Sequence, residues 1–283
     1  MANVINTNVK SILAQNAMTT NNRSLEKTMQ QLSTGKRING AADDAAGLAI
    51  SEKMTGQIRG LNQAVRNAND GISMMQTAEG ALIETTNMLQ RMRELAVQSS
   101  TGSLDSTQRG YLNSEYVALG KEIDNIAKST TWNGMQILAG ASGAAGKKVS
   151  KVTFQVGANN STDNQASVSF LRMTAASGVF ATAIGTVSTV TKARVAMDAI
   201  DTALNNVASY RAKLGATINQ LTYAADNLSN VSMNTSASRS RILDTDYAQA
   251  TTELARTQII SQAATAMLAQ ANQQPQSVLS LLK

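Results

Sequence analysis

The chain of 283 residues contains no cysteine, no histidine and a single proline, and aromatic residues make up only 3% of it. The lack of cysteine excludes disulfides and thiolate metal sites, and the lack of histidine removes the commonest metal ligand and proton shuttle. Large buried sheets prefer aromatic and β-branched residues, whereas alanine and methionine, which supply much of the apolar 42%, suit long helices. We therefore expect a mainly α protein held together by packing and assembly.

Two further absences limit the partners. No apolar run approaches the ~18 residues of a membrane span, so we expect no membrane partner. The first residues, MANVINTNVKSILAQNAM, lack the basic and long apolar regions of a cleavable signal peptide. The net charge is +6, but the densest basic patches, at 91–93 and 238–241, have no neighbouring aromatic residue, so we expect no nucleic-acid partner either.

The apolar residues between 54 and 75 recur in alternating steps of four and three, and the series continues at heptad spacing to 96, which is the seam of a coiled coil. This spacing predicts one long helix over residues 45–99 that ends at Thr101-Gly102-Ser103. The predicted seam consists of Met54, Ile58, Leu61, Val65, Ala68, Ile72, Met75, Leu82, Leu89, Met92 and Ala96.

Two more stripes predict partners for this helix. Asp105 followed by Gln108 is typical of a capping box, and apolar residues at the same spacing follow it through 112–126. A third stripe runs through 197–228 and matches the first in length. Regular spacing of about 3.5 residues favours near-parallel packing, so we predict a long coiled-coil helical bundle built from the N- and C-terminal halves.

The period changes in the middle of the chain. Asn133-Gly134 is a turn signal, and apolar residues alternate with polar ones through 152–156 and 168–170, which predicts short β-hairpins. Residues 141–146 and 174–191 are small or Ser/Thr-rich with weak patterning, so we expect surface loops there.

The two ends of the chain are also helical in spacing, over residues 3–34 and 243–272, but they are diluted with Asn, Gln, Ser and Thr. A helix this weakly apolar is marginal alone, because fixing its backbone costs about 1–2 kcal/mol per residue. We expect the two ends to pair with each other and to become ordered on assembly.

The stretch 32–54, LSTGKRINGAADDAAGLAISEKM, has glycines, basic residues and adjacent carboxylates that could suggest a phosphate site. Gln30 stands where a P-loop needs glycine, and Arg37 replaces the Ser/Thr that would hold magnesium. Adjacent carboxylates on a helix point about 100° apart and cannot share one metal or proton. We interpret the stretch as a connector between two helices, in which the acids favour the positive end of the helix at 45. Its members are Gly35, Arg37, Gly40, Asp43 and Asp44.

Catalysis has little support in the sequence. Without His or Cys, a nucleophile would need a Ser-Lys or carboxylate arrangement, and no such motif stands out. We expect neither an enzyme nor a bound cofactor or metal.

Three stretches carry a close resemblance to bacterial flagellin: the stretch 32–54, the residues NDGISMMQTAEGALIETTNMLQRMRELAVQS, and the closing SRILDTDYAQATTELARTQIISQAATAMLAQANQQPQSVLSLLK. The resemblance covers about 1–140 and 190–283. It implies a subunit that polymerises with its own copies into an extracellular flagellar filament and is exported without a cleaved signal peptide. Only 141–189 separate the two halves, which implies a short form with little or no outer variable domain.

The resemblance also implies a division of the chain into three regions. Residues 1–43 and 240–283 would form the paired helices of the inner core of the filament. Residues 44–140 and 190–239 would form the bundle of the outer tube, and 141–189 the β-hairpin and variable loops.

Further partners follow from the resemblance alone. They are a flagellar secretion chaperone and the export apparatus, reached through the terminal segments, the filament cap and hook-junction proteins, and the host toll-like receptor for flagellin. The implied polymerisation tail is Leu254, Ile260, Met267, Val278, Leu279, Leu281 and Leu282. The implied receptor or subunit patch is Arg91, Leu95, Gln98 and Glu115. Leu95 lies off the main seam, so it is either an apolar anchor of this patch or a residue that packs against the helix at 106–128.

Two alternatives remain at this point. A hook–filament junction protein of the same axial superfamily shares similar ends, although the match through 76–100 and 243–283 favours flagellin. A cytoplasmic coiled-coil scaffold would share the helical seams, and cell fractionation distinguishes it from a filament released by shearing.

Overall fold

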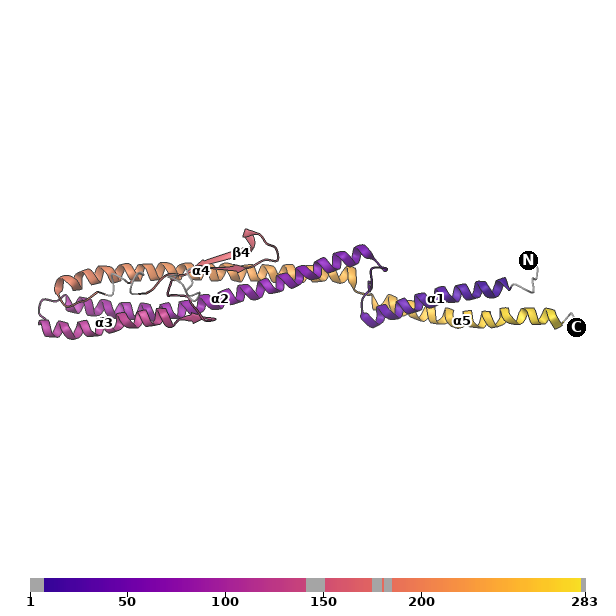
Figure 1. Cartoon of the computed structure of the whole chain (residues 1–283), viewed down its shortest axis with the longest axis horizontal. Helices are drawn as coiled ribbons and strands as arrows, with labels where there is room; N and C mark the ends of the chain where they lie inside the picture. The colour runs from indigo at the N-terminus through magenta and orange to yellow at the C-terminus, as the bar shows by residue number, and fades with distance from the viewer. Residues whose placement is uncertain (1–7, 141–150, 175–179, 181–184, 281–283) are drawn as a thin grey trace. The chain divides into compact units, whose positions relative to one another are not determined.

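A computed structural model describes residues 8–140, 151–174, 180 and 185–280 of the chain (Figure 1). The described chain is mainly α, with two short antiparallel hairpins, which confirms the predicted fold class. The elements in order are α1 (Val9–Thr34), α2 (Ala45–Ser99), α3 (Ser106–Ser129), β1 (Thr131–Trp132), β2 (Met135–Gln136), β3 (Lys151–Gln155), η1 (Thr162–Asn164), β4 (Gln165–Ser169), α4 (Val190–Leu243) and α5 (Tyr247–Ser280). Among the described residues, no helix has the length and apolarity needed to cross a membrane.

The chain forms two compact units. Unit 1 consists of residues 1–58 and 233–283, and unit 2 of residues 59–232. The boundaries between the units therefore fall inside α2 and α4, whereas the three predicted regions divide the chain near the ends of these helices.

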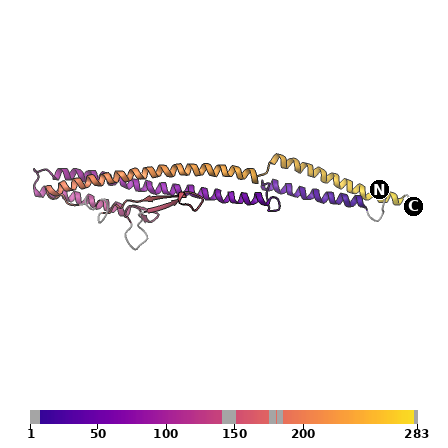
Figure 2. The same cartoon turned by 90° about the horizontal axis from the view of Figure 1, so that it is seen from above.

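Unit 2 is a bundle of α2, α3 and α4 around one apolar core. In both views the long helices α2 and α4 lie side by side, with α3 along α2 (Figures 1 and 2). The helices α2 and α4 run antiparallel, since Arg93 pairs with Asp201 and Asn62 with Ser232. Most of the predicted seam is buried, including Leu61, Leu82, Leu89 and Met92 on α2 and Ile200, Val207, Leu214 and Leu221 on α4, whereas Val65 and Ile72 are half-buried.

The helix α2 spans the residues predicted for it, and its end is fixed by the start of α3. The Asp105 side chain and the Gln108 side chain form the expected capping box. Arg109 adds a contact that the sequence pattern does not show: its guanidinium donates to the carbonyls of Ser99 and Thr101 at 3.1 and 2.8 Å. These bonds satisfy carbonyls that the end of a helix leaves without partners.

The helix α4 begins at Val190, seven residues before the first residue of the predicted stripe. The expected loop over 174–191 is therefore wrong at its C-terminal end. The reason is that Ala193 and Ala196, which are buried in the core, continue the seam with side chains too small to stand out in an apolar pattern.

Both predicted hairpins are present. Strands β1 and β2 pair across Asn133 and Gly134, whose positive φ angles of 46° and 76° suit a tight hairpin turn. Strands β3 and β4 pair with Val152 opposite Val168, and Phe154 packs over Gly71 of α2, where a Cβ atom would lie 3.3 Å from the ring. The expected loop 141–146 lies outside the described residues.

The seam predicts which substitutions destabilise unit 2. Leu221→Ala removes a side chain with 0% exposure, so we expect a loss of ~2–5 kcal/mol in the free energy of unfolding. Tyr223→Ala, two residues along α4 and 75% exposed, is the matched control and should change it by less than about 0.5 kcal/mol. Urea unfolding of the full chain measures both, and equal losses would contradict the assigned seam.

Candidate functional site

The pairing of α1 with α5 in unit 1 is made by small and polar side chains. The helices run antiparallel, since Asn8 donates from Nδ2 to the Ala271 carbonyl at 2.8 Å and Asn21 donates to the Thr257 carbonyl at 2.8 Å. The side chains buried along this contact are those of Ser11, Asn21, Thr28, Ala250 and Thr257. The predicted pairing of the two ends is confirmed, but its contact is polar.

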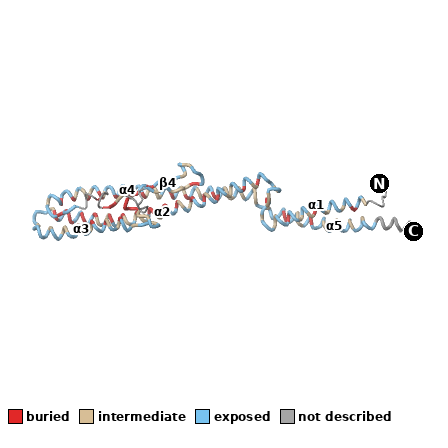
Figure 3. The backbone as a smooth tube through the Cα atoms, viewed as in Figure 1, coloured by how far each residue is buried: buried red, intermediate tan, exposed pale blue. Residues whose placement is uncertain are grey.

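Many large apolar side chains of the same helices are exposed, whereas Leu25, Leu32 and Leu254 are half-buried. Figure 3 shows mostly exposed surface along α1 and α5. Leu13 is 71% exposed, Ile259 65% and Met267 66%, and the set also includes Val9, Ile12, Met29 and Ile260. Burying one such side chain fully stabilises a protein by about 1.5–3 kcal/mol, so the pair carries an apolar surface that unit 1 leaves uncovered.

A groove of about 640 Å³ runs between the two helices. The apolar members of its lining are Leu13, Ala17 and Ile260, and polar residues of both helices supply the rest. The rim carries the Arg256–Glu253 ion pair at 3.2 Å. The groove can therefore accept an apolar side chain that is bordered by hydrogen-bonding groups.

The predicted polymerisation tail is only partly visible. Ile260 and Met267 are exposed and Leu254 is half-buried. Val278 and Leu279 belong to α5 by their backbone, while Leu281 and Leu282 lie outside the described residues.

The predicted connector is tied to the segment between α4 and α5. Arg37 donates from its amide to the Leu243 carbonyl and from Nη2 to the Ile242 carbonyl, both at 2.7 Å. The Thr245 amide returns a bond to the Gly35 carbonyl at 3.0 Å, and Lys36 pairs with Asp244 in a single β-bridge. The segment between α1 and α2 and the segment between α4 and α5 are thus hydrogen-bonded to each other. We call these two segments, residues 35–44 and 242–246, the joint.

The two glycines of the connector have different roles. Gly35 ends α1 with a φ of +68°, and a Cβ there would lie 3.2 Å from the Tyr247 hydroxyl. A glycine is favoured at such a left-handed helix end. A Cβ at Gly40 would meet nothing within 4 Å, so the space there would admit a side chain. The contribution of Gly40 is its amide, which donates to the Asp43 carboxylate.

Asp43 and Asp44 have different roles, which corrects the expectation that both acids favour the start of α2. Asp44 caps α2, because its carboxylate accepts from the Gly47 amide at 2.8 Å. Asp43 does not serve the start of that helix. Its carboxylate accepts from the amides of Asn39 and Gly40 and forms an ion pair with Lys27 at 2.9 Å.

The chemistry of Asp43 is set by these contacts. The hydrogen bond from Lys27, followed by the Asn39 amide, lowers the pKa of the Asp43 carboxyl below its ordinary 3.8. Sequence reasoning missed two residues here: Lys27 of α1, which pairs with Asp43 of the joint, and the buried Ile38 inside the joint. Both gain their roles only when the chain turns back on itself.

The predicted patch on α2 is brought together, except for its apolar anchor. The Arg91 guanidinium contacts Glu115 of α3 at 2.9 Å and Glu94 at 2.8 Å, and these hydrogen bonds raise the pKa of Arg91. Gln98 is exposed. Leu95 is only 1% exposed and belongs to the core, so of its two predicted roles the structure shows packing inside the bundle and not an exposed anchor. The reason is that α2 packs against both α3 and α4 and buries two stripes.

Within the described parts of the chain, no cluster of three or more Asp, Glu, His or Cys residues could hold a metal ion. The features that stand out are therefore the uncovered surface of α1 and α5, the joint, and the charged patch around Arg91. These features suit contact between proteins.

Comparison with known proteins covers nearly the whole chain. Residues 5–144 match the bacterial flagellin N-terminal helical region, and residues 197–282 match the bacterial flagellin C-terminal helical region. The chain is 46% identical to a flagellin of Halalkalibacterium halodurans, over 99% of this chain and 100% of that protein. It is 42% identical to the flagellar filament 33 kDa core protein of Treponema phagedenis, over 99% and 100%.

One solved structure adds to the fold. A putative flagellar hook-associated protein from Vibrio parahaemolyticus superposes with a TM-score of 0.59, covering 71% of this chain and 100% of that one. At 13% identity this likeness concerns the fold alone.

The ion pair in the joint makes a testable prediction about acid. Because the folded pKa of Asp43 lies below 3.8, its stabilising effect is complete above that pH and is lost as the pH falls through the folded value. Lys27→Gln should raise the pKa of Asp43 towards 3.8, as measured by NMR titration of the carboxyl carbon. Lys53→Gln, on α2, is the control, and a pKa unmoved by the Lys27 change would contradict the assigned contact.

Proposed function

Because this chain belongs to the bacterial flagellin family, we propose that it is the structural subunit of a flagellar filament and that it polymerises with its own copies. The observation that carries the proposal is the uncovered apolar surface on α1 and α5. A subunit whose surface complements a different surface on its neighbour forms an open helical polymer when the rotation between neighbours does not close a ring. The relative from Treponema phagedenis, which this chain matches from end to end, is described as a filament core protein.

The polar contact between α1 and α5 supports this role. Small residues let the helices approach, and hydrogen bonds such as Asn21 to Thr257 set their register without burying large apolar groups. The apolar side chains are then free for neighbouring subunits. The pair gains most of its stability when those neighbours cover Leu13, Ile259 and their companions.

The role is structural and requires no catalysis or cofactor. It accounts for the arrangement of the chain as one well-packed bundle in unit 2 and one uncovered helix pair in unit 1. The hook–filament junction alternative has no separate observation in its favour, since the likeness to a hook-associated protein extends only to the fold.

The proposed route to the filament is export through the flagellar channel without a cleaved signal peptide, to a final location outside the cell. A secretion chaperone would cover the exposed apolar surface of the terminal segments before export. The filament cap and the hook-junction proteins would bind the same apolar surface of the terminal segments while the filament grows. These partners follow from membership of the family and from the uncovered surface.

The host toll-like receptor for flagellin is a further proposed partner of the monomer. Its contact would be the exposed polar patch of Arg91, Gln98 and Glu115. Leu95 would support this patch indirectly, because its buried side chain packs α2 against the rest of the bundle. The patch is then a charged surface on a rigid helical support.

Variants of the uncovered surface test polymerisation. Leu13→Gln combined with Ile259→Gln should abolish filament formation from seeds, because both side chains are exposed in the single chain and lose their apolar contact. Thr19→Gln, an exposed polar position on α1, is the control and should polymerise. Sedimentation and electron microscopy measure the outcome. Filaments of normal yield from the double variant would contradict the proposal.

A second test concerns the receptor. Arg91→Ala should lower activation by soluble monomer at least tenfold, since it removes the charge that pairs with Glu115. Arg93→Ala is a closely matched control, because Arg93 lies outside the patch and forms an ion pair with Asp201 of α4 at 2.6 Å. Helicity is followed by circular dichroism, and equal activation by the two folded variants would remove the patch from consideration.

A further inference from the structure

The outer edge of β4 in unit 2 has backbone groups that the hairpin does not use. The Val156 amide donates to the Asn164 carbonyl at 2.8 Å, so these two residues form a hydrogen-bonded pair of the ladder. Bonded and non-bonded pairs alternate in an antiparallel ladder. Val152 and Val168 are therefore a bonded pair, whereas the amides and carbonyls of Ser167 and Ser169 point away from β3.

No strand pairs with this outer edge among the described residues. The opposite edge, on β3, is engaged, because the Asn67 side chain donates to the Gln155 carbonyl at 3.0 Å. An unpaired edge is a ready template for an added strand.

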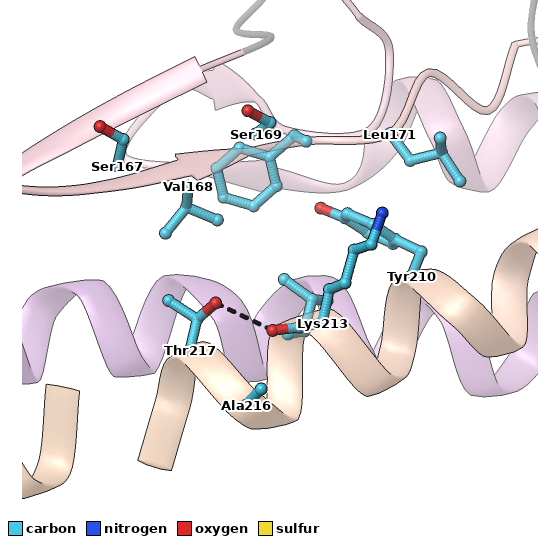
Figure 4. Close-up of a pocket in the computed structure, with 10 residues that line it drawn as sticks. Ser167, Val168, Ser169, Leu171, Tyr210, Lys213, Ala216 and Thr217 are labelled. Carbon is cyan, nitrogen blue, oxygen red and sulfur yellow. Dashed lines mark hydrogen bonds between the residues drawn. The ribbon is translucent and has the colours of Figure 1, made fainter. Parts of the chain in front are cut away.

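A groove of about 520 Å³ lies between this edge and α4. Figure 4 shows the side chain of Val168 directed towards α4, and those of Ser167 and Ser169 directed away from it. The apolar lining comes from Val168, Phe170, Leu171 and Leu214. The groove is thus bounded by a strand edge and by an apolar wall, which suits an extended chain.

One end of the groove has hydrogen-bond donors. Tyr210 is 7% exposed, and its hydroxyl is buried without a hydrogen-bond partner. Figure 4 shows this hydroxyl at the groove, with the Lys213 ammonium group beside the ring. Burial raises the pKa of Tyr210 to about 12, and the nearby Leu171 amide lowers it to a smaller extent. That amide does not reach hydrogen-bond geometry with the hydroxyl. The phenol is therefore a proton donor at neutral pH.

We propose that this groove binds an extended acidic segment of a partner protein, which adds a strand to β4 and places a carboxylate between Tyr210 and Lys213. The backbone of the segment pairs with Ser167 and Ser169, its inward side chains contact Val168 and Phe170, and its carboxylate accepts from the phenol and the ammonium group. The site is independent of the surface on α1 and α5 that the proposed polymerisation uses.

The probe is a fluorescein-labelled peptide, Thr-Val-Thr-Val-Thr-Asp with an amidated end, whose alternate residues place two valines and the aspartate on one side. Full-length soluble chain should bind it with saturation below about 1 mM, as measured by fluorescence anisotropy. Hydrogen exchange at the Ser167 and Ser169 amides should slow on binding. A peptide with Asn in place of Asp, and one N-methylated on alternate backbone nitrogens, should each bind at least tenfold more weakly.

Two protein variants complete the test. Ser167→Pro removes an outward amide without touching the β3–β4 bonds, and Lys213→Glu reverses the charge; each should weaken binding at least tenfold. Thr153→Pro, at the opposite edge of the same hairpin, is the matched control and should bind normally. The proposal is overturned if the acidic peptide shows no saturation, if the N-methylated peptide binds equally, or if Ser167→Pro and Lys213→Glu, with unchanged melting, retain affinity.

Discussion

The side chains that are fully buried between α1 and α5 are small or polar, and the proposed assembly of the chain depends on this composition. Asn21 and Thr257 fix the pairing by a hydrogen bond, while many of the large apolar side chains of both helices are left exposed. A helix pair of this kind is specific in register but weak in isolation, because hydrogen bonds contribute far less net stability than the burial of several large apolar side chains. The missing burial must come from another molecule.

Unit 2 shows the opposite distribution of residues. Its leucines and methionines lie inside, from Leu82 and Met92 on α2 to Leu214 on α4, and its helices need no neighbour to bury them. The joint separates the two kinds of packing. It is held by hydrogen bonds from the Arg37 amide and guanidinium to the carbonyls of residues 243 and 242, and by the ion pair between Lys27 and Asp43.

The sequence predicted the long-range pattern well and the local partners poorly. The helix at 45–99 was predicted at both ends because its heptad pattern is long and its flanking residues cap or end it. The role of Leu95 stayed open in the sequence, because its position off the main seam fits both an apolar anchor and packing against the helix at 106–128. The structure shows packing, since a helix between two others buries a second stripe. The early start of α4 was missed because alanine is weakly apolar. The polar contact of α1 with α5 and the pairing of Lys27 with Asp43 join residues whose proximity no periodicity reveals.

The most direct test of this account is hydrogen exchange followed by mass spectrometry on the soluble chain and on its polymer. If the exposed apolar surface makes the α1–α5 pair marginal, amides in 9–34 and 247–280 should exchange rapidly in the soluble chain, while those of α2 and α4 within 59–232 are strongly protected. In the polymer, both groups should be protected. Strong protection of α1 and α5 in the soluble chain, equal to that of unit 2, would contradict the claim that neighbouring subunits complete their folding.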